Sequence, residues 1–302
     1  MSETGLNKGG ATRYAEGMFE NFDQLTTEHG MGEHVKTLRK YLLPCVGFQL
    51  KAGEGTGRSR MGGEAEVPDG FEWPVHGGRK LDFVLQIDLA ELPASGVAGR
   101  LPRSGILSFF YDLEEQPWGF DPKDLSGHRV CYFPESVALR HRGDESPIPK
   151  AAMKFWSGWS LPARDSGTGE LLFRELSEAT DSDFISDQYH GLSEAVRAVG
   201  APNPGGPSHR IGGHSDNVQG DMQLEAQLVT NGLYCGDSRG YQDPRAKELE
   251  KTCAEWQLLL QLDSDDDIGF MWGDCGMLYY WGREASLARG DFSRTWMGLQ
   301  CC

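Results

Sequence analysis

Trp256-Gln-Leu-Leu-Leu-Gln-Leu-Asp263 and Gly276-Met-Leu-Tyr-Tyr-Trp281 are two apolar runs joined by an interval crowded with carboxylates. Along the first run, one side carries Leu258, Leu260 and Leu262, and the other side carries Leu259, Gln261 and Asp263. A period of two is typical of a strand with one buried face. The two runs therefore predict a pair of strands connected by an acidic hairpin loop.

The same design occurs earlier in the chain. Phe83-Val-Leu-Gln-Ile-Asp-Leu89 alternates in the same way and is followed by the apolar run Gly105-Ile-Leu-Ser-Phe-Phe-Tyr111. This repetition predicts an internal duplication in which residues 81–111 and 256–281 superpose, with Gln86 over Gln261. Because a buried amide must be hydrogen-bonded, two interpretations remain open. The two amides meet in one network, or they line a cleft between the halves and contact a ligand there.

Further motifs lie upstream of the acidic run. They are Gly62-Gly63-Glu-Ala-Glu-Val-Pro68-Asp-Gly-Phe-Glu-Trp73-Pro74, Leu85-Gln86-Ile-Asp88-Leu and Gly220-Asp221-Met222. With these motifs the chain resembles the YwqG-like family, also known as the DUF1963 domain. The resemblance implies an α+β, strand-dominated fold of two pseudo-repeated β-rich halves with flanking helices, and it implies no settled activity. Relatives are sometimes encoded beside toxin genes, and this association suggests an immunity role.

The chain is expected to have two parts. Residues 1–61 form a helical segment followed by a basic, glycine-rich connection, and residues 62–302 form the YwqG-like domain. The halves of this domain span about 62–200 and 209–302, and a loop rich in glycine and proline joins them. Outside the repeated units we expect helices over 14–43 (with a break at 30–32), 185–199 and 243–255, and strands over 45–50, 129–133, 171–174, 223–229 and 296–300.

Composition places the chain among soluble globular proteins, since 38% of its 302 residues are hydrophobic and 25% are charged. No apolar run approaches the roughly 20 residues that span a bilayer, and the N-terminus has no signal segment, so we expect a cytoplasmic protein. Seven cysteines, an odd number without a C-x-x-C pair, argue against a disulfide framework and against a zinc site.

The formal net charge is -16, from 45 acidic and 29 basic residues. Such a surface repels nucleic-acid phosphates, which need clustered basic side chains. It favours encounter with a basic protein partner or a cation, although an acidic surface also serves simply to solvate a protein.

The acidic interval has part of the pattern of a calcium loop. Asp263, Asp265 and Asp267 alternate as the first ligands of such a loop do, and Asp274 falls at its closing acid. Ile268 occupies the sixth position, where a calcium loop needs glycine. These four aspartates are the candidate ligands of a divalent metal, calcium or magnesium; the alternative is a hairpin loop whose aspartates cap their own backbone. No other cofactor is expected.

A second polar cluster consists of His209, His214, Asp216, Gln219, Asp221 and Glu225. Relatives carry the residues that correspond to Gln219 and Asp221, so the resemblance favours a shared role for these two. Two carboxylates can act as general acid and base when their environments separate their pKa values; the alternative use of this cluster is to cap turns and helices.

The segment Gly236-Asp-Ser238-Arg-Gly240 matches the G-x-S-x-G motif of hydrolases. No histidine follows Ser238 in the chain, so the order of a hydrolase triad is not met. Because every catalytic template fails on spacing or order, we expect a non-enzymatic binding or interaction protein. The alternative is an enzyme that uses a carboxylate-bound metal, or acid–base carboxylates, in a cleft between the halves.

Trp73 and Trp118 each lie beside a proline in a loop, where a large aromatic ring often anchors a partner. The candidate ligand-binding or partner-binding residues are Gln86, Asp88, Gln219, Asp221, Gln261, Trp73 and Trp118.

Overall fold

The computed structural model describes residues 21–53, 55–93, 100–143, 145–177 and 182–301. Residues 21–28 are helical, and after a turn at Gly30 (φ 73°) the chain forms η1 (Gly32–His34) and α2 (Val35–Tyr41). The predicted break between two helical pieces is therefore confirmed. The part of this prediction that covers residues 14–20 lies outside the described residues.

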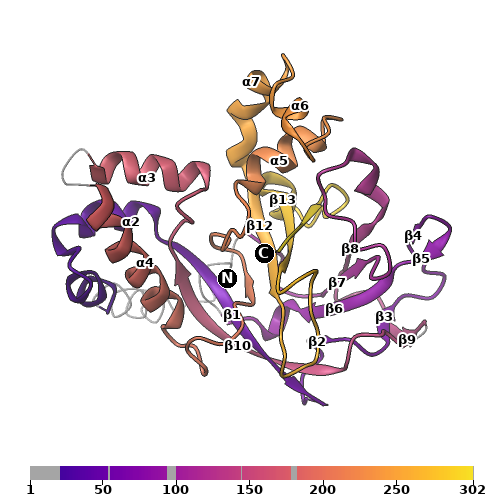
Figure 1. Cartoon of the computed structure of the whole chain (residues 1–302). Helices are drawn as coiled ribbons and strands as arrows, with labels where there is room; N and C mark the ends of the chain where they lie inside the picture. Colours follow the sequence, from indigo (N-terminus) through magenta and orange to yellow (C-terminus); the bar gives the residue numbers. More distant parts are fainter. Residues whose placement is uncertain (1–20, 54, 94–99, 144, 178–181, 302) are drawn as a thin grey trace, which may run out of the picture.

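The fold is built on a ten-stranded antiparallel sheet with the order β14-β13-β12-β11-β1-β10-β2-β6-β7-β8. The long strands β1 and β10 form its centre and run diagonally across Figure 1. The predicted strands over 45–50, 83–89, 105–111, 129–133, 256–263, 276–281 and 296–300 are all present in it. The bounds are β1 (Leu43–Ala52), β2 (Arg60–Met61), β6 (Asp82–Asp88), β7 (Ile106–Tyr111), β8 (His128–Phe133), β10 (Ala151–Ser160), β11 (Arg210–Ile211), β12 (Trp256–Asp263), β13 (Met277–Arg283) and β14 (Trp296–Gln300).

Strands β6 and β12 each carry a bulge, and this departs from strict alternation. The register of β6 on β7 shifts between Phe83 and Leu85, and that of β12 on β13 shifts between Leu258 and Leu260. Each bulge adds one residue to the main core, so Val84 lies there with Leu85, while Phe83 packs in a separate cluster. A bulge inserts one residue and re-aims the side chains around it, which the sequence period alone does not reveal.

The sheet curves around its main apolar core until its two edge strands approach each other. Rings of Phe109 on β7 and Tyr280 on β13 meet across the core, with centroids 5.0 Å apart. Near the edges, His128 Nε2 lies 3.1 Å from the Thr295 carbonyl oxygen, and the Leu299 N–H donates to the Trp118 carbonyl oxygen. The result is a nearly closed sheet.

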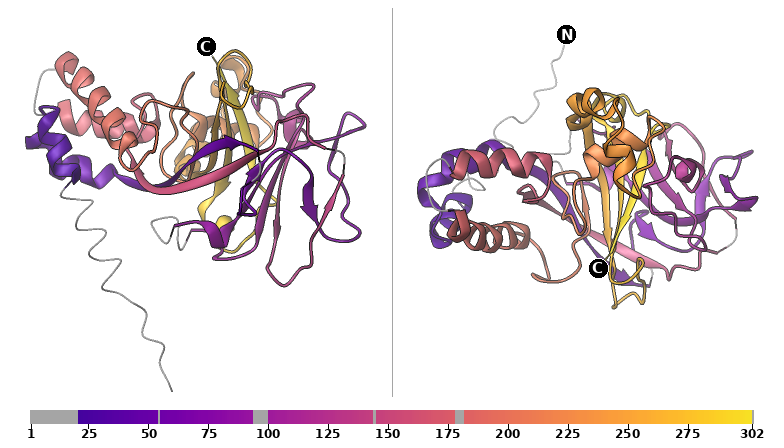
Figure 2. Two further views of the ribbon diagram at one scale, coloured as in Figure 1. Left: turned by 90° about the horizontal axis from the view of Figure 1, so that it is seen from below. Right: turned by 45° about the horizontal axis from the view of Figure 1, so that its top comes forward.

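Two groups of helices cover different parts of this sheet. Helix α2 with α3 (Gly167–Ser177) and α4 (Ser182–Ala198) forms a lobe. In Figure 1 and in both views of Figure 2 this lobe lies at the end of the molecule opposite the hairpin of β4 (Val75–His76) and β5 (Arg79–Lys80). Helix α5 (Met222–Val229), α6 (Ser238–Tyr241), α7 (Ala246–Leu249) and η4 (Glu250–Glu255) form a cap at the top of Figure 1. The remaining elements are β3 (Ala65–Val67), η2 (Leu89–Glu91), η3 (Pro122–Ser126), β9 (Arg140–Arg142) and α8 (Glu284–Leu287).

These helices correct four predictions made from the sequence. The strands expected over 171–174 and 223–229 are wrong, because these residues belong to α3 and α5. In α3 the buried Leu172 and Leu176 are four residues apart, which is helical spacing. The helix expected from 243 to 255 starts at Ala246 and continues as the 3-10 turns of η4. Helices and strands contribute similar shares of the chain, so the fold is mixed α+β rather than strand-dominated.

The helix expected over 185–199 is confirmed as α4. Within the described ranges, no helix combines the length and the apolarity needed to cross a membrane.

Candidate functional site

A buried network surrounds Gln261 on β12. Its side-chain oxygen accepts a hydrogen bond from the Asp216 N–H (2.8 Å), and its amide nitrogen donates to the Ser208 carbonyl (2.8 Å) and to Asp216 Oδ2 (3.0 Å). Arg210 lies directly across from Gln261 in the β11–β12 ladder. The amide therefore holds the segment from Ser208 to Asp216 against the sheet.

Asp216 and Arg210 form the charged centre of this network. The Arg210 guanidinium, whose side chain is 5% exposed, donates to Asp216 and to Ser208 Oγ. Burial raises the pKa of Asp216, but the charge of Arg210 and hydrogen bonds from Ser208 and Gln261 outweigh it and lower the pKa. The pair is therefore ionised. Arg197 Nη1, from α4, lies 3.7 Å from Asp216 Oδ2 and links the helical lobe to the network.

A second network with the same kinds of partners surrounds Gln86. Its oxygen accepts from the Glu66 N–H (3.2 Å), and its nitrogen donates to the Arg58 carbonyl (2.9 Å) and to Glu66 Oε1 (2.9 Å). Glu66 also binds the guanidinium groups of Arg58 and Arg60. Burial raises the pKa of Glu66, but these partners outweigh it and bring the pKa to about 2.

The two amides do not bond to each other. Each is fully buried and uses both of its amide hydrogens within its own network. The interpretation that Gln86 and Gln261 meet is therefore wrong. The basic, glycine-rich connection at the end of residues 1–61 is part of the packed fold, because its Arg58 and Arg60 belong to the Gln86 network.

Replacing Gln86 or Gln261 by Leu is expected to cost about 1–3 kcal/mol of unfolding free energy each, because buried groups lose their partners. The two losses should add to within about 0.5 kcal/mol, since the networks share no residue. Urea unfolding of both single variants and of the double variant measures this. A coupling energy well above that limit would mean that the two amides act as one unit.

The acidic loop lies between β12 and β13, and its aspartates have different environments. Asp263 Oδ2 accepts from the Ser208 N–H (2.8 Å), and Asp265 Oδ1 caps the Asp267 N–H (3.0 Å). Asp267 and Asp274 are exposed. Among the residues that the structure describes, no three His, Cys, Asp or Glu side chains are placed to hold a metal ion. The divalent metal on these four aspartates stays a prediction.

His209 links this loop to the Gln261 network. Its ring stacks on Phe48 with centroids 5.2 Å apart, its Nδ1 accepts from the Asp263 N–H (3.1 Å), and its Nε2 lies 3.3 Å from Asp265 Oδ2. A backbone N–H can only donate, so Nδ1 carries no proton and Nε2 donates to Asp265. Burial raises the pKa of Asp265, but His209 and the backbone hydrogen bonds from Asp267 and Ile268 together outweigh burial and lower the pKa. Both ring nitrogens are occupied, so His209 has a structural role.

Asp88 and Asp221 both cap helical segments. Asp88 accepts from the Ala90 N–H (3.0 Å) at the start of η2 and lies 3.7 Å from the Arg58 guanidinium. Asp221 Oδ1 accepts from the Gln223 N–H (2.8 Å) at the start of α5, and its Oδ2 accepts from the Gly167 N–H (3.1 Å) at the start of α3. Burial raises the pKa of Asp221. Asp221 therefore has the capping role that was the alternative use of its cluster, and Asp88 caps η2.

The other predicted contact residues each have their own local partners. Gln219 is exposed, and its backbone N–H donates to Gln300 Oε1 (3.0 Å). Trp73 is half-buried, donates to the Leu81 carbonyl (2.7 Å) and packs edge-on against Phe110. Trp118 is half-buried against the main core. The structure therefore does not bring the predicted residues into one site, and both tryptophans serve packing.

Glu225 on α5 is the most strongly perturbed carboxyl in the cap. Burial raises its pKa to about 7, the hydrogen bond from the Tyr241 hydroxyl (3.4 Å) lowers it, and the charge of Asp221 raises it. Tyr241 comes from α6, so this contact joins two helices of the cap.

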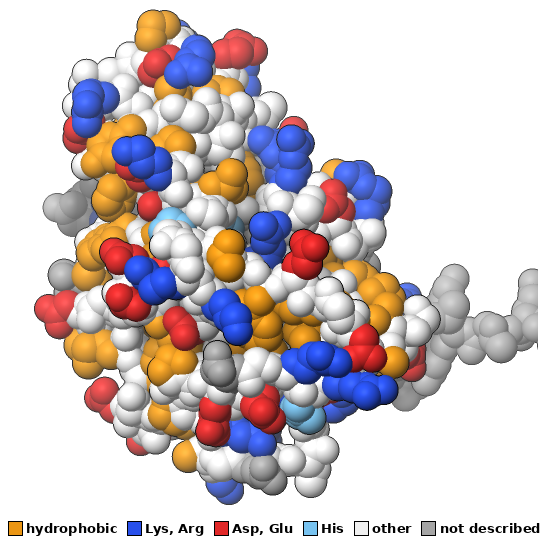
Figure 3. Space-filling model, turned by 90° about the vertical axis from the view of Figure 1, so that its right-hand side faces the viewer, with side chains coloured by type: hydrophobic (Ala, Val, Ile, Leu, Met, Phe, Trp, Pro, Cys, Tyr) orange, Lys and Arg blue, Asp and Glu red, His pale blue; other side chains and the backbone are white. Residues whose placement is uncertain are grey.

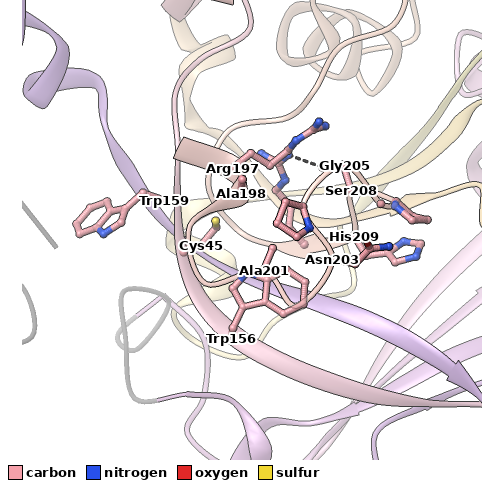
Figure 4. A pocket seen from close by; sticks show the side chains of 16 residues that line it. Cys45, Trp156, Trp159, Arg197, Ala198, Ala201, Asn203, Gly205, Ser208 and His209 are labelled. Carbon is pink, nitrogen blue, oxygen red and sulfur yellow. Dashed lines mark hydrogen bonds between the residues drawn. The ribbon is translucent and has the colours of Figure 1, made fainter. Parts of the chain in front are cut away.

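A pocket opens beside the Gln261 network, between the strands β1 and β10 and the loop formed by residues 200–208 (Figure 4). Trp156, Arg197, Asn203 and Arg210 line it, together with Cys45, whose thiol has a pKa raised to about 11 by burial. Sequence reasoning missed these residues. One signal was present, since Arg60-Met-Gly-Gly and Arg210-Ile-Gly-Gly repeat the same pattern, with an acid six residues after each arginine.

The geometry defines a mixed α+β protein with a nearly closed antiparallel sheet and two buried arginine–carboxylate–glutamine networks. The chain belongs to the DUF1963 family: the family model described as "Domain of unknown function (DUF1963)" matches residues 59–301. No curated protein matches the chain.

Proposed function

We propose that this chain is a non-enzymatic interaction protein whose acidic loop, residues 264–276, binds a basic protein partner. The observation that carries this proposal is a set of exposed carboxylates on a rigid loop. Asp266, Asp267 and Asp274 are exposed, and none forms an ion pair with a residue in the described part of the chain. Between them Met271 is 45% exposed and offers an apolar contact.

The base of this loop is fixed by hydrogen bonds. Asp265 and Phe270 exchange backbone hydrogen bonds of 2.8 and 3.1 Å, and the Ser264 hydroxyl donates to the Gly276 carbonyl (2.7 Å). Ile268 and Trp272 point into the main core. Such a loop loses little conformational entropy when it binds, and this favours affinity.

The surrounding charges favour a cationic partner. The Gly273 N–H donates to Gln116 Oε1 (3.3 Å), which brings a second acidic segment next to the loop. In this segment Asp112, Glu114 and Glu115 all pair with the same guanidinium, that of Arg79, so the carboxylates outnumber the cation. On the face drawn in Figure 3, by contrast, acidic and basic side chains are interspersed. The acidic loop therefore concentrates part of the net charge of -16, and this speeds the approach of a basic protein.

An immunity role is the more specific form of this proposal, in which the acidic loop covers a basic toxin. The non-enzymatic interpretation is supported by the structural roles of the polar side chains that were candidates for catalysis. His209 uses both ring nitrogens, and Asp221 caps one helix and accepts from the start of another.

We also infer that the chain arose by internal duplication, with halves of about 62–200 and 209–302. Support comes from the two equivalent networks and from the bulges at equivalent places in β6 and β12. In addition, the glycine pairs at 62–63 and 212–213 all have positive φ, between 63° and 75°.

Immobilised wild-type protein and the variant D266N/D267N/D274N serve as matched baits for a panel of purified basic proteins, including candidate toxins. We expect wild-type association rates to fall about tenfold between 50 and 300 mM salt, because screening removes long-range attraction. The variant should associate slowly at both salt concentrations. Met271→Ser should mainly hasten dissociation, since apolar contacts act after encounter.

Equal rates for the variant and the wild type would contradict the proposal. A turnover activity that is lost in Asp221→Asn or Asp265→Asn, with folding intact, would favour the enzyme alternative.

A further inference from the structure

We propose that the pocket between the β1–β10 strands and the 200–208 loop binds a small carboxylate with a planar apolar body. This site is separate from the acidic loop and does not depend on the protein partner.

The planar surface in the pocket is Trp156. A Cβ added at Gly47, on the neighbouring strand, would lie 2.4 Å from Trp156 Cε2, so the glycine makes room for the indole against β1. Gly200 (φ 77°) also lies close to this ring, since a Cβ added there would be 3.3 Å from Trp156 Cδ1. In Figure 4 the ring of Trp156 lies beside the loop residues, whereas Trp159 points away and packs with the helical lobe. Trp156 is therefore held in place while it remains only half-buried.

The lining of the pocket offers hydrogen-bond donors. Neither Trp156 Nε1 nor the Asn203 amide donates a hydrogen bond to any residue in the described ranges, and neither atom is sealed from solvent. Arg197 presents a guanidinium with five N–H groups; one nitrogen binds Glu194 and another lies 3.7 Å from Asp216. Donors thus remain for a ligand.

The charges in the pocket favour an anion. Two arginines, Arg197 and Arg210, line it, and none of the other lining residues in the described part of the chain is acidic. Asp216 lies behind both guanidinium groups and offsets part of their charge. The Cys45 thiol, with its raised pKa, stays neutral. A carboxylate matches the guanidinium fork, and the net charge of -16 disfavours a doubly charged phosphate relative to a singly charged carboxylate.

Benzoate is a suitable probe, because it combines one carboxylate with one planar ring. Its binding is followed by NMR through the indole N–H signal of Trp156, which Trp156→Phe identifies. We expect saturable shifts of this signal with a Kd of about 1–10 mM, the range for a ligand of this size. The uncharged isostere benzamide should bind at least about tenfold more weakly, because it lacks the charge-assisted bond. Phosphate at the same concentration should not displace benzoate.

Two variants of one ion pair separate a binding role of Arg197 from a structural one. Arg197→Gln should raise the Kd of benzoate about tenfold or more. Glu194→Gln removes the closer of the two carboxylates beside Arg197, so this variant should bind benzoate as tightly as the wild type or more tightly. The indole signals of the other tryptophans report whether each variant is folded. The proposal is overturned if benzoate gives no saturable shift, if benzamide or phosphate matches it, or if Arg197→Gln leaves the Kd unchanged.

Discussion

Asp216→Asn is expected to destabilise the fold by about 3–5 kcal/mol, because the Arg210 guanidinium stays buried without its counter-charge. The Arg210 side chain is only 5% exposed and lies across from Gln261 in the β11–β12 ladder, so water replaces little of the lost counter-charge. Asparagine keeps the size of the side chain, so the loss reports charge and hydrogen bonding rather than a cavity. The measurement is the unfolding free energy from urea titration at neutral pH.

Asp237→Asn is the matched control for this substitution. Asp237 pairs with Arg239 on the surface, where ion pairs contribute little. Its unfolding midpoint should stay at the wild-type value. If Asp216→Asn were equally neutral, the Arg210–Asp216 pair would not be an organising element of the fold.

Glu225→Gln is expected to raise the unfolding free energy at pH 8 by at most roughly 3 kcal/mol and to change it little at pH 4.5. Burial raises the pKa of Glu225 from 4.5 to about 7, so the folded state holds this proton more tightly than the unfolded state does. The contribution of Glu225 to the wild-type unfolding free energy is therefore fully present below pH 4.5. It declines as the pH rises towards 7 and stays reduced above that. Glutamine stays uncharged and avoids this loss.

Unfolding free energies at pH 4.5, 6 and 8 test this pH dependence. Glu135→Gln serves as control, since Glu135 is exposed and its substitution should give the same small effect at every pH. A gain for Glu225→Gln that does not grow with pH would contradict a raised pKa at this carboxyl.

The strands were predictable where the sequence alternates with a period of two. The runs around Gln86 and Gln261 were identified in this way, and both lie where expected. The apolar pieces in α3 and α5 were misread because Leu171-Leu-Phe-Arg174 and Gln223-Leu-Glu-Ala-Gln-Leu-Val229 are too short for the strand and helix periods to be told apart. Tertiary packing decides such cases.

The sequence predicted that the two buried glutamines have hydrogen-bond partners, but not which residues these partners are. That a buried glutamine needs partners follows from its position in an apolar run. Its partners depend on the fold, since Asp216 is 45 residues from Gln261 and Arg197 reaches Asp216 from a separate lobe. The pocket was not predictable for the same reason: the strands β1 and β10, the end of α4 and the 200–208 loop come from separate parts of the chain and form it together.

The central position of β1 means that the folding unit is larger than the family match. The family model begins at residue 59, whereas β1 ends at Ala52 and is hydrogen-bonded along its whole length to β10 and, on its other side, to β11. A chain shortened to residues 59–301 would lose the strand that joins the two sides of the sheet, and β10 would become a long open edge prone to aggregation. The boundary of sequence similarity therefore does not mark a boundary of autonomous folding.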